Sequence, residues 1–199
     1  MKTEFIELLR STGRKGMENV IDYLERSGFF QAPASVNRHL SYDGGLLEHS
    51  MNVYRVAVKL RESMILVKAE LEAQLPAESI AIATLLHDVC KSAIYKKKEK
   101  FRKDANDRWE KYIGYEPDYS RFPVGHGEKS VIMLLRLGLE LTNDEILAIR
   151  WHMSAWDLPF QSYEQKSNVS EASDVPLVAL TQAADGLATH LLEAGKEQP

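Results

Sequence analysis

This 199-residue sequence has one cysteine, no long apolar run and no large excess of positive or negative charge. Cys90 is the single cysteine, so an internal disulfide is excluded and nothing indicates an oxidising compartment. No stretch approaches the roughly 20 apolar residues that a bilayer-spanning helix needs. The first residues, MKTEFIELLRSTGRKG, lack the apolar core of a signal peptide. We therefore expect a soluble, cytoplasmic protein with no membrane partner.

The charge balance is nearly even. A formal net charge of −4 argues against a surface built throughout for nucleic acid, although it leaves room for a local basic patch. With 44% hydrophobic and 27% charged residues, the composition excludes a disordered or fibrous chain. The length suits one domain with a substantial core, so we expect a single domain over 1–199.

Strand-like alternation is almost absent, whereas helical periodicity is widespread. A loop is expected over 29–45. Helices are expected over 3–10 and 16–27, from Leu46, from Pro76 to His87, over 127–138, after the Thr142–Glu145 capping-box pair, and over about 174–193. The exception is 94–116, where aromatic and charged residues flank a turn-rich centre, a pattern typical of a β-hairpin. The predicted fold class is all-α, a helical bundle with a small β-hairpin insertion near 94–116.

Several histidines and aspartates fall on the inward faces of the predicted helices. His49, His87 and His152 occupy apolar-face positions, Asp88 follows His87 directly, and Asp185 stands at the edge of the last inward stripe. Each residue alone is most often a hydrogen-bonded core group, a cap or a surface charge. If they are buried together without partners, each carboxylate would cost several kcal/mol of stability. The whole free energy of unfolding of a protein is only about 5–15 kcal/mol. The joint pattern therefore favours a metal cluster, which turns these groups into ligands.

The order of these residues and their surroundings resemble a known superfamily. The segments are GGLLEHS (44–50), LLHDVCK (85–91), GHGEKS (125–130), RWHMS (150–154) and ADGLAT (184–189). In this order they are similar to the motifs of the HD-domain superfamily of metal-dependent phosphohydrolases, over about 44–192. The His-Asp dipeptide is common in proteins, whereas the five elements in sequence are specific. The resemblance implies an HD core over 44–192, preceded by an N-terminal helical extension over 1–43.

The resemblance also implies a metal centre. One divalent ion would be held by His49, His87, Asp88 and Asp185, and a second by His126 and His152, with Asp88 bridging. Nitrogen and oxygen ligands suit Fe, Mn, Ni, Zn, Co or Mg and do not select among them. Two such ions can share a bridging water, lower its pKa and direct the hydroxide at phosphorus. The catalytic candidates are Asp88 and Lys91, which lies about one helical turn further on, where it could bind phosphate; the alternative is a solvated lysine at a helix end.

Basic residues are concentrated in Lys96–Lys103 (KKKEKFRK), with Phe101 among them and further aromatic residues following. Four of these basic residues are candidates for substrate binding: Lys96, Lys97, Lys98 and Arg102. They would attract a phosphorylated or nucleotide substrate, and the aromatic side chains would stack on a base. The alternative is a solvated surface loop.

Two other functions are compatible with the same ligands. HD-fold mixed-valent di-iron oxygenases that resemble myo-inositol oxygenase have this ligand order, and ligand types alone do not separate them from hydrolases. A non-catalytic nucleotide or nucleic-acid binding module is the second alternative, although no ligand has been lost. We favour hydrolysis of a phosphomonoester or phosphodiester in a small phosphorylated substrate, a nucleotide rather than nucleic acid. No Gly-Tyr-Pro element follows the later histidines, which disfavours a cyclic dinucleotide, and the oligomeric state is left open.

Overall fold

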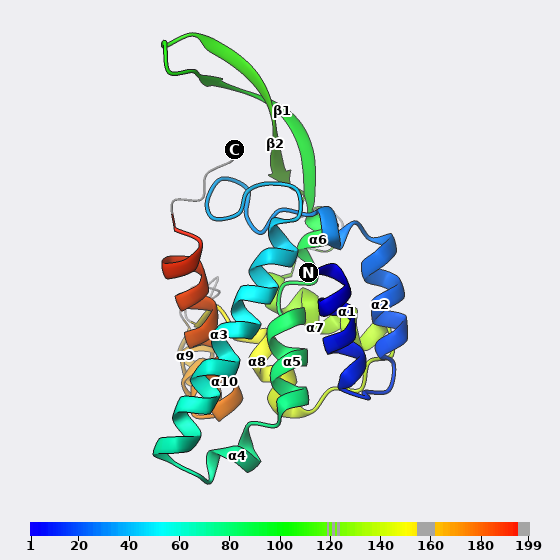
Figure 1. The fold of residues 1–199 in the computed structure, drawn as a ribbon, viewed down its shortest axis with the longest axis vertical. Coiled ribbons are helices and arrows are strands. Elements are labelled where there is room, and N and C mark those ends of the chain that lie inside the picture. The colour runs from blue at the N-terminus through cyan, green and yellow to red at the C-terminus, as the bar shows by residue number, and fades with distance from the viewer. Residues whose placement is uncertain (119, 121, 123, 155–161, 195–199) are drawn as a thin grey trace.

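The chain folds mainly into helices, as predicted, with one small β-hairpin (Figure 1). The computed structural model describes residues 1–118, 120, 122, 124–154 and 162–194. The helices are α1 (Lys2–Ser11), α2 (Met17–Arg26), the 3₁₀ turn η1 (Phe29–Gln31), α3 (Gly45–Val67), α4 (Leu71–Gln74), α5 (Ala77–Leu86), α6 (Lys91–Ile94), α7 (His126–Arg136), α8 (Asn143–Arg150), α9 (Tyr163–Ser173), α10 (Pro176–Leu187) and the π-helical turn η3 (Ala188–Leu192). None of these helices is long and apolar enough to cross a membrane.

Helix α5 lies at the centre of the bundle. Every residue from Ser79 to Leu86 is buried, as expected for a helix that is apolar on nearly all sides. Helices α1, α3, α8 and α10 pack against it. The core consists of two apolar clusters, one containing Phe5, Leu24, Phe29, Leu46 and Leu85, and the other containing Val53, Ile80, Ala148, Leu177 and Ala184. The elements that carry five of the six predicted ligands therefore meet around α5, and α7, which carries His126, packs against α8.

The loop before α3 packs closely against the start of that helix. Leu40 adopts a left-handed conformation, with φ of 46°. A Cβ atom on Gly45 would lie 2.0 Å from the Leu40 carbonyl oxygen, so only glycine permits this approach. The loop is held further by Ser35, whose hydroxyl donates to the carbonyl of His39 at 2.7 Å. As a result, the ring of His39 lies beside that of His49, with centroids 5.2 Å apart.

A second close approach joins the start of α7 to the end of α8. A Cβ atom on Gly127 would lie 2.4 Å from the carbonyl oxygen of Arg150. Glycine therefore allows two backbone segments to touch where a side chain would separate them. The contact brings His126, the first residue of α7, next to His152, which follows α8.

A buried carboxylate ties α5, α8 and the turn after α1 together. The Glu145 side chain is fully buried and accepts hydrogen bonds from both terminal nitrogens of Arg14, at 2.7 and 2.8 Å. It also accepts from the hydroxyl of Ser79 at 2.7 Å and from the backbone N–H of Thr142 at 2.8 Å. The predicted capping box of Thr142 and Glu145 is confirmed, and the same carboxylate forms a buried ion pair.

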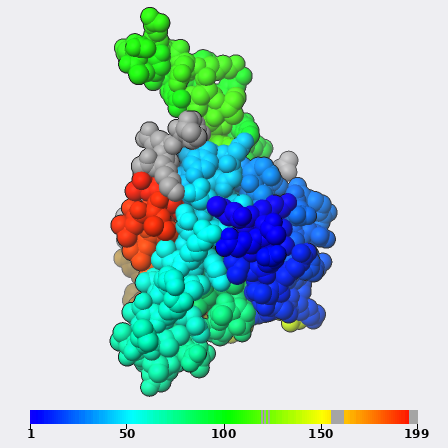
Figure 2. All heavy atoms as spheres, viewed as in Figure 1, coloured from blue at the N-terminus to red at the C-terminus, as the bar shows by residue number. Residues whose placement is uncertain are grey.

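The hairpin predicted near 94–116 is confirmed. Strands β1 (Tyr95–Lys103) and β2 (Trp109–Pro117) pair in antiparallel register from Tyr95 opposite Pro117 to Lys103 opposite Trp109. The hairpin projects from the bundle as a narrow arm (Figures 1 and 2). Its base is fixed by Asp43, whose carboxylate accepts hydrogen bonds from Lys97 Nζ at 2.6 Å and from the Tyr115 hydroxyl.

The C-terminal helices differ from the prediction. The helix expected over 174–193 begins at Pro176, because Pro at the first helical position loses no hydrogen bond there. It is α-helical only to Leu187, and residues 188–192 form the π-helical turn η3. The preceding α9 was not predicted, because it is polar along most of its length and has little amphipathic periodicity.

Candidate metal centre

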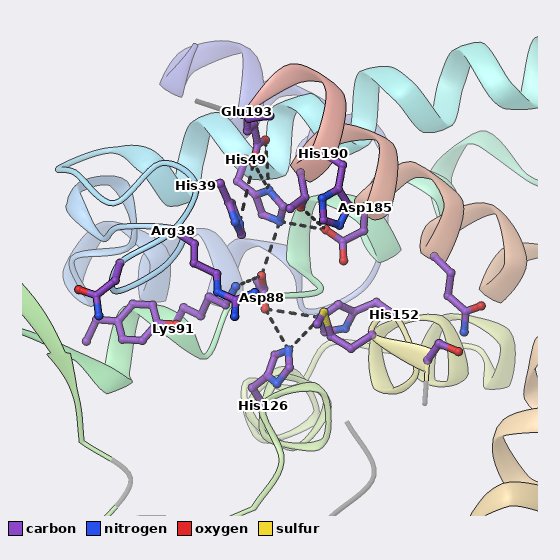
Figure 3. Close-up of a pocket in the computed structure, with 18 of the residues that line it drawn as sticks. Arg38, His39, His49, Asp88, Lys91, His126, His152, Asp185, His190 and Glu193 are labelled. Carbon is purple, nitrogen blue, oxygen red and sulfur yellow. Dashed lines mark hydrogen bonds and ion pairs between the residues drawn. The ribbon is translucent and has the colours of Figure 1, made fainter. Parts of the chain in front are cut away.

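Five of the six predicted ligands line one cavity of about 1180 Å³ (Figure 3), and the sixth is buried beside it. The cavity lies between the loop before α3, the turn from α5 to α6, the start of α7, the residues after α8 and the C-terminal end of α10. His49, Asp88, His126, His152 and Asp185 line it. The sixth residue, His87, is fully buried, and its Nε2 atom lies 3.2 Å from Nε2 of His49.

Three of the ligands lie beyond the helices that were expected to carry them. His87 is the C-terminal cap of α5, and Asp88 lies in the turn that follows. Helix α8 ends at Arg150, so His152 lies in the turn after it. Asp88 is 2% exposed and His152 is 3% exposed. Tight turns at helix ends, rather than helix faces, therefore point these side chains into the cavity.

One side of the cavity gathers His49, His87, Asp88 and Asp185. Nε2 of His49 lies 3.3 Å from Asp185 Oδ1 and 3.7 Å from Asp88 Oδ2. Nε2 of His87 lies 3.2 Å from the same Asp88 Oδ2. All four side chains are nearly buried. His49, His87 and Asp185 each offer a ligand atom within 4.8 Å of the others, close enough for a single cation, and Asp88 lies beside the two histidines.

The other side of the cavity pairs His126 with His152. Their Nε2 atoms lie 3.0 Å apart. Asp88 Oδ1 lies 3.7 Å from Nε2 of His126 and 3.6 Å from Nε2 of His152. Asp88 therefore presents Oδ2 to the first pair of histidines and Oδ1 to the second. This is the arrangement of a carboxylate that bridges two positions.

The outer nitrogens of the rings determine which atoms face the cavity. Nδ1 of His87 lies 2.8 Å from the carbonyl oxygen of Thr84, and Nδ1 of His152 lies 2.8 Å from that of Ile149. A carbonyl only accepts, so Nδ1 of each ring carries the proton and donates it. Nε2 of His87 and of His152 therefore present lone pairs to the cavity, as metal-binding imidazoles do.

An unpartnered acceptor provides a separate test of metal fit. Asp88 Oδ1 is buried and has no hydrogen-bond partner among the described residues. A buried carboxylate oxygen without a partner is costly, and a cation between it, His126 and His152 would remove that cost. The nitrogen and oxygen donors present fit a divalent metal ion.

The charged states reflect the same crowding of ligands. Burial lowers the pKa of His49, but hydrogen bonds to Asp185 and Glu193 raise it more strongly, to about 9. Burial and the neighbouring His87 lower the pKa of His152 to about 3. Burial opposes ionisation of Asp88, but Lys91 and His87 outweigh it and hold its pKa well below the ordinary value. The metal-free protein thus balances its aspartates with protons and Lys91, and metal binding would release a proton.

The four residues predicted to bind substrate lie on β1 rather than in the cavity wall. Each pairs with a carboxylate: Lys96 with Asp118, Lys97 with Asp43, Lys98 with Glu116, and Arg102 with Glu110. Tyr95, the first residue of β1, does line the cavity. The cations therefore begin at the edge of the site and continue along the arm away from it. Their role in substrate binding stays a prediction.

Sequence reasoning missed several residues that border the candidate ligands, among them Glu193 and His39. Glu193 is buried beside His49, and His39 lies in the loop before α3. Glu193 was missed because, eight residues after Asp185 in a regular α-helix, its side chain would point about 80° away from the Asp185 direction. His39 lies in a loop, where no periodicity marks an inward position. The available signal for Glu193 was its position at the end of the predicted helix that carries Asp185.

Comparisons with known proteins give two partial similarities. A family described as "Putative helicase" matches residues 29–123, which include His49, His87 and Asp88. The chain is also 36% identical over 69 residues to a dihydroneopterin 2′,3′-cyclic phosphate phosphodiesterase from Methanocaldococcus jannaschii. That alignment covers 35% of this chain and 26% of the relative, so the chain spans about a quarter of that protein. No solved structure matches the chain significantly.

Proposed function

We propose that the protein is a metal-dependent phosphohydrolase of the HD-domain superfamily, which cleaves a phosphomonoester or phosphodiester in a small substrate, with a nucleotide favoured. The observation that carries the proposal is the position of Asp88, which offers one oxygen to His49 and His87 and the other to His126 and His152. The HD core would extend over 44–192, with 1–43 as an N-terminal helical extension.

The ligands divide naturally between two ions. His49, His87, Asp185 and Asp88 Oδ2 would hold the first, and His126, His152 and Asp88 Oδ1 the second. Two divalent ions in these positions would supply Lewis acidity that activates a water molecule and neutralises phosphate oxygens. Fe, Mn, Ni, Zn, Co and Mg are all compatible with this donor set.

Lys91 places a positive charge at this centre. Its Nζ lies 2.5 Å from Asp88 Oδ2, and its side chain is 14% exposed and lines the cavity. It would contact a phosphate oxygen and stabilise the negative charge on the leaving oxygen.

The substrate class rests on the cavity and on the phosphodiesterase similarity. A volume of about 1180 Å³ is ample for a nucleotide, since small-molecule sites span roughly 300–1,000 Å³. The relative's name specifies a cyclic phosphodiester of a pterin, so cyclic phosphates belong among the substrates to be tested. Residues 1–199 contain no Gly-x-x-x-x-Gly-Lys-Ser/Thr motif for ATP, and a helicase activity is therefore not part of the proposal.

The proposal is tested by coupling metal analysis to a substrate panel. Purified protein is stripped with chelator, refilled with each candidate metal and analysed for metal per chain. Release of product is then measured under anaerobic conditions from aryl phosphomonoesters and phosphodiesters, nucleoside monophosphates and nucleoside 2′,3′-cyclic phosphates. We expect metal-dependent hydrolysis, lost together with bound metal in His87→Ala and Asp88→Asn.

The outcomes separate the competing functions. Full activity of either variant after refilling, or wild-type protein that binds no divalent metal, would overturn the proposal. A mixed-valent iron centre that consumes O₂, with no anaerobic phosphoester cleavage, would instead assign the di-iron oxygenase class. Metal-independent binding of nucleotide or nucleic acid without turnover would assign a binding module.

A further inference from the structure

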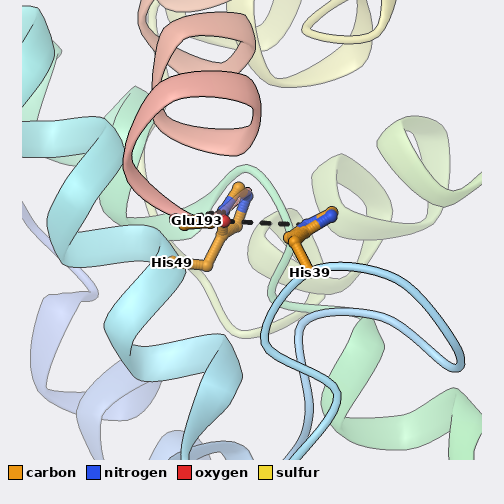
Figure 4. Close-up of side chains that lie close together, drawn as sticks. All are labelled: His39, His49 and Glu193. Carbon is orange, nitrogen blue, oxygen red and sulfur yellow. Dashed lines mark hydrogen bonds and ion pairs between the residues drawn. The ribbon is translucent and has the colours of Figure 1, made fainter. Parts of the chain in front are cut away.

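The carboxylate of Glu193 lies next to the His49 ring (Figure 4), at the nitrogen opposite the one that faces the candidate metal centre. Its two oxygens lie 3.2 and 3.1 Å from Nδ1 of His49. The Glu193 side chain is fully buried, and its Oε1 also accepts a hydrogen bond from Asn52 Nδ2 at 3.0 Å. Nε2 of the same His49 ring faces Asp185 and His87. One imidazole therefore links the carboxylate to the predicted ligands.

The π-helical turn accounts for the position of this carboxylate. In a continuous α-helix, the eight residues from Asp185 to Glu193 would rotate the side chain by about 80° from the Asp185 direction. Residues 188–192 instead form a wider turn, closed by a hydrogen bond from the N–H of Glu193 to the carbonyl of Ala188 at 3.1 Å. The wider turn rotates the chain less per residue, and both carboxylates reach the same histidine. Such π-turns recur at functional sites.

We propose that Glu193 is a positioning residue for the metal centre, which holds the His49 ring so that its Nε2 faces the ion bound by His87 and Asp185. The inference rests on the proposed metal site. A buried carboxylate needs a donor, and the Nδ1–H of His49 supplies it. In return, the carboxylate fixes the orientation of the ring, makes Nε2 the ligand atom and increases its basicity. The side chain of Asn52 donates a hydrogen bond to Oε1 of Glu193 and so helps to fix the orientation of the carboxylate.

Glu193 acts through His49 rather than as a ligand of its own. His39, His49 and Glu193 do place one potential ligand atom each within 4.8 Å of one another. An ion there would have to bind Nδ1 of His49, while Nε2 of the same ring points to the predicted centre. His39 Nε2 is also 3.9 Å from Glu193 Oε2, beyond hydrogen-bond distance. The hydrogen bond to Nδ1 satisfies the carboxylate without a third ion.

Metal affinity tests the inference directly. The dissociation constant of Zn²⁺ is measured by competition with a chromophoric chelator, together with zinc equivalents per chain at saturation. Glu193→Ala is expected to weaken binding of the more tightly bound ion by about 10–100-fold, the usual effect of losing such a partner. Glu193→Gln keeps the size and an acceptor oxygen but loses the charge, so an intermediate loss is expected. Asn52→Ala should shift the affinity in the same direction by less.

Leu191→Ala is the matched control, because Leu191 lies in the same π-turn with its side chain exposed to solvent. Its zinc affinity should equal that of wild type. In zinc-loaded protein labelled with ¹⁵N-histidine, the wild-type Nδ1–H signal of His49 should be protected from solvent exchange. That protection should be lost in Glu193→Ala, an effect that a general loss of stability at this turn would not give in a folded variant.

The failure of this inference differs from that of the proposed function. Wild-type protein that binds no divalent metal would contradict the function and the inference with it. If wild-type protein binds metal, and Glu193→Gln and Glu193→Ala both bind it with wild-type affinity, the positioning role alone is overturned. Loss of a whole zinc equivalent in Glu193→Gln at saturation would make Glu193 a ligand and also overturn it.

Discussion

Lys91 and Asp88 form an ion pair inside the cavity, with Nζ 2.5 Å from Oδ2. Burial lowers the pKa of Lys91, but Asp88 outweighs burial and holds the pKa above its ordinary value. The lysine is therefore charged at neutral pH. It neutralises the carboxylate that faces both histidine pairs, and in the proposed function it would contact a phosphate oxygen. In that function, this pair combines a candidate metal ligand with a cation that would stabilise negative charge in the transition state.

Lys91→Ala is therefore expected to lower kcat by about 10²–10³-fold, the usual cost of removing one donor that stabilises transition-state charge. Metal per chain should stay at the wild-type value, because the variant removes no predicted ligand. Lys91→Arg should recover part of kcat. Steady-state kinetics and elemental analysis of the same samples check both results. Loss of metal from Lys91→Ala would assign the lysine a structural role instead.

The cations at the base of the hairpin are expected to act on substrate capture. Replacing Lys96, Lys97 and Lys98 with Gln should raise KM for an anionic substrate at low salt and leave kcat unchanged, with the effect fading at high salt. Their carboxylate partners reduce the field that they produce, so we expect a change of only a few-fold.

Lys103→Gln is the matched control for the hairpin. It lies eight residues along β1 from Tyr95, which lines the cavity, about 26 Å at the usual rise of a strand. This exceeds the Debye length of about 8 Å at physiological salt, so KM should not change. A KM that is equal for the triple variant and wild type would favour a solvated arm without a role in binding.

The helical periodicity of the sequence predicted the ligand positions only where an apolar stripe continues through them. His49 lies within α3 and Asp185 within α10, and both point inward as the pattern indicated. Helices 3–10 and 16–27 appear as Lys2–Ser11 and Met17–Arg26 because the apolar spacing that predicts them is local. The hairpin was predictable for the same reason, since its turn and its alternation lie within about 20 residues.

Other features depend on contacts between distant segments, which periodicity does not report. His87 and His152 lie at or after helix ends, and backbone carbonyls of the preceding turn orient their rings. Gly127 reveals its role only once Arg150 is beside it. Glu193 reaches His49 because of a π-helical turn, and the amino-acid types in that turn do not predict it. Spacing in the sequence thus identified the candidate ligands, and tertiary packing determined how their side chains are oriented.

Glu145 should be among the most costly residues to remove for stability. Glu145→Ala leaves Arg14, which is 17% exposed, without its bidentate partner and deprives Ser79 of an acceptor. Breaking a buried ion pair in this way costs about 3–5 kcal/mol. Urea unfolding monitored by circular dichroism should show that loss. Glu140→Ala removes an exposed partner of Lys15 and should change the free energy of unfolding little. Equal effects in the two variants would contradict the importance of burial.

Gly127 is expected to control the second ion specifically. In Gly127→Ala, the new Cβ would meet the Arg150 carbonyl oxygen at 2.4 Å, and a backbone atom cannot rotate away as a side chain would. The start of α7 must therefore move, which separates His126 from His152, now 3.0 Å apart at Nε2. We expect a loss of about 1–3 kcal/mol in stability, as for other overpacked sites, and weaker binding of one metal equivalent.

The matched control is Gly186→Ala. Gly186 lies in α10, and a Cβ atom added there would have no neighbouring heavy atom within 4 Å outside its own helix backbone. Alanine is favoured over glycine in a helix, so this variant should gain about 0.5–1 kcal/mol and keep both metal equivalents. Elemental analysis after dialysis against graded chelator concentrations distinguishes the two ions by affinity. If Gly127→Ala kept both equivalents at wild-type affinity, the close contact of α7 with α8 would not be what assembles the second site. The ion would then have to depend on Asp88 and on only one of the two histidines.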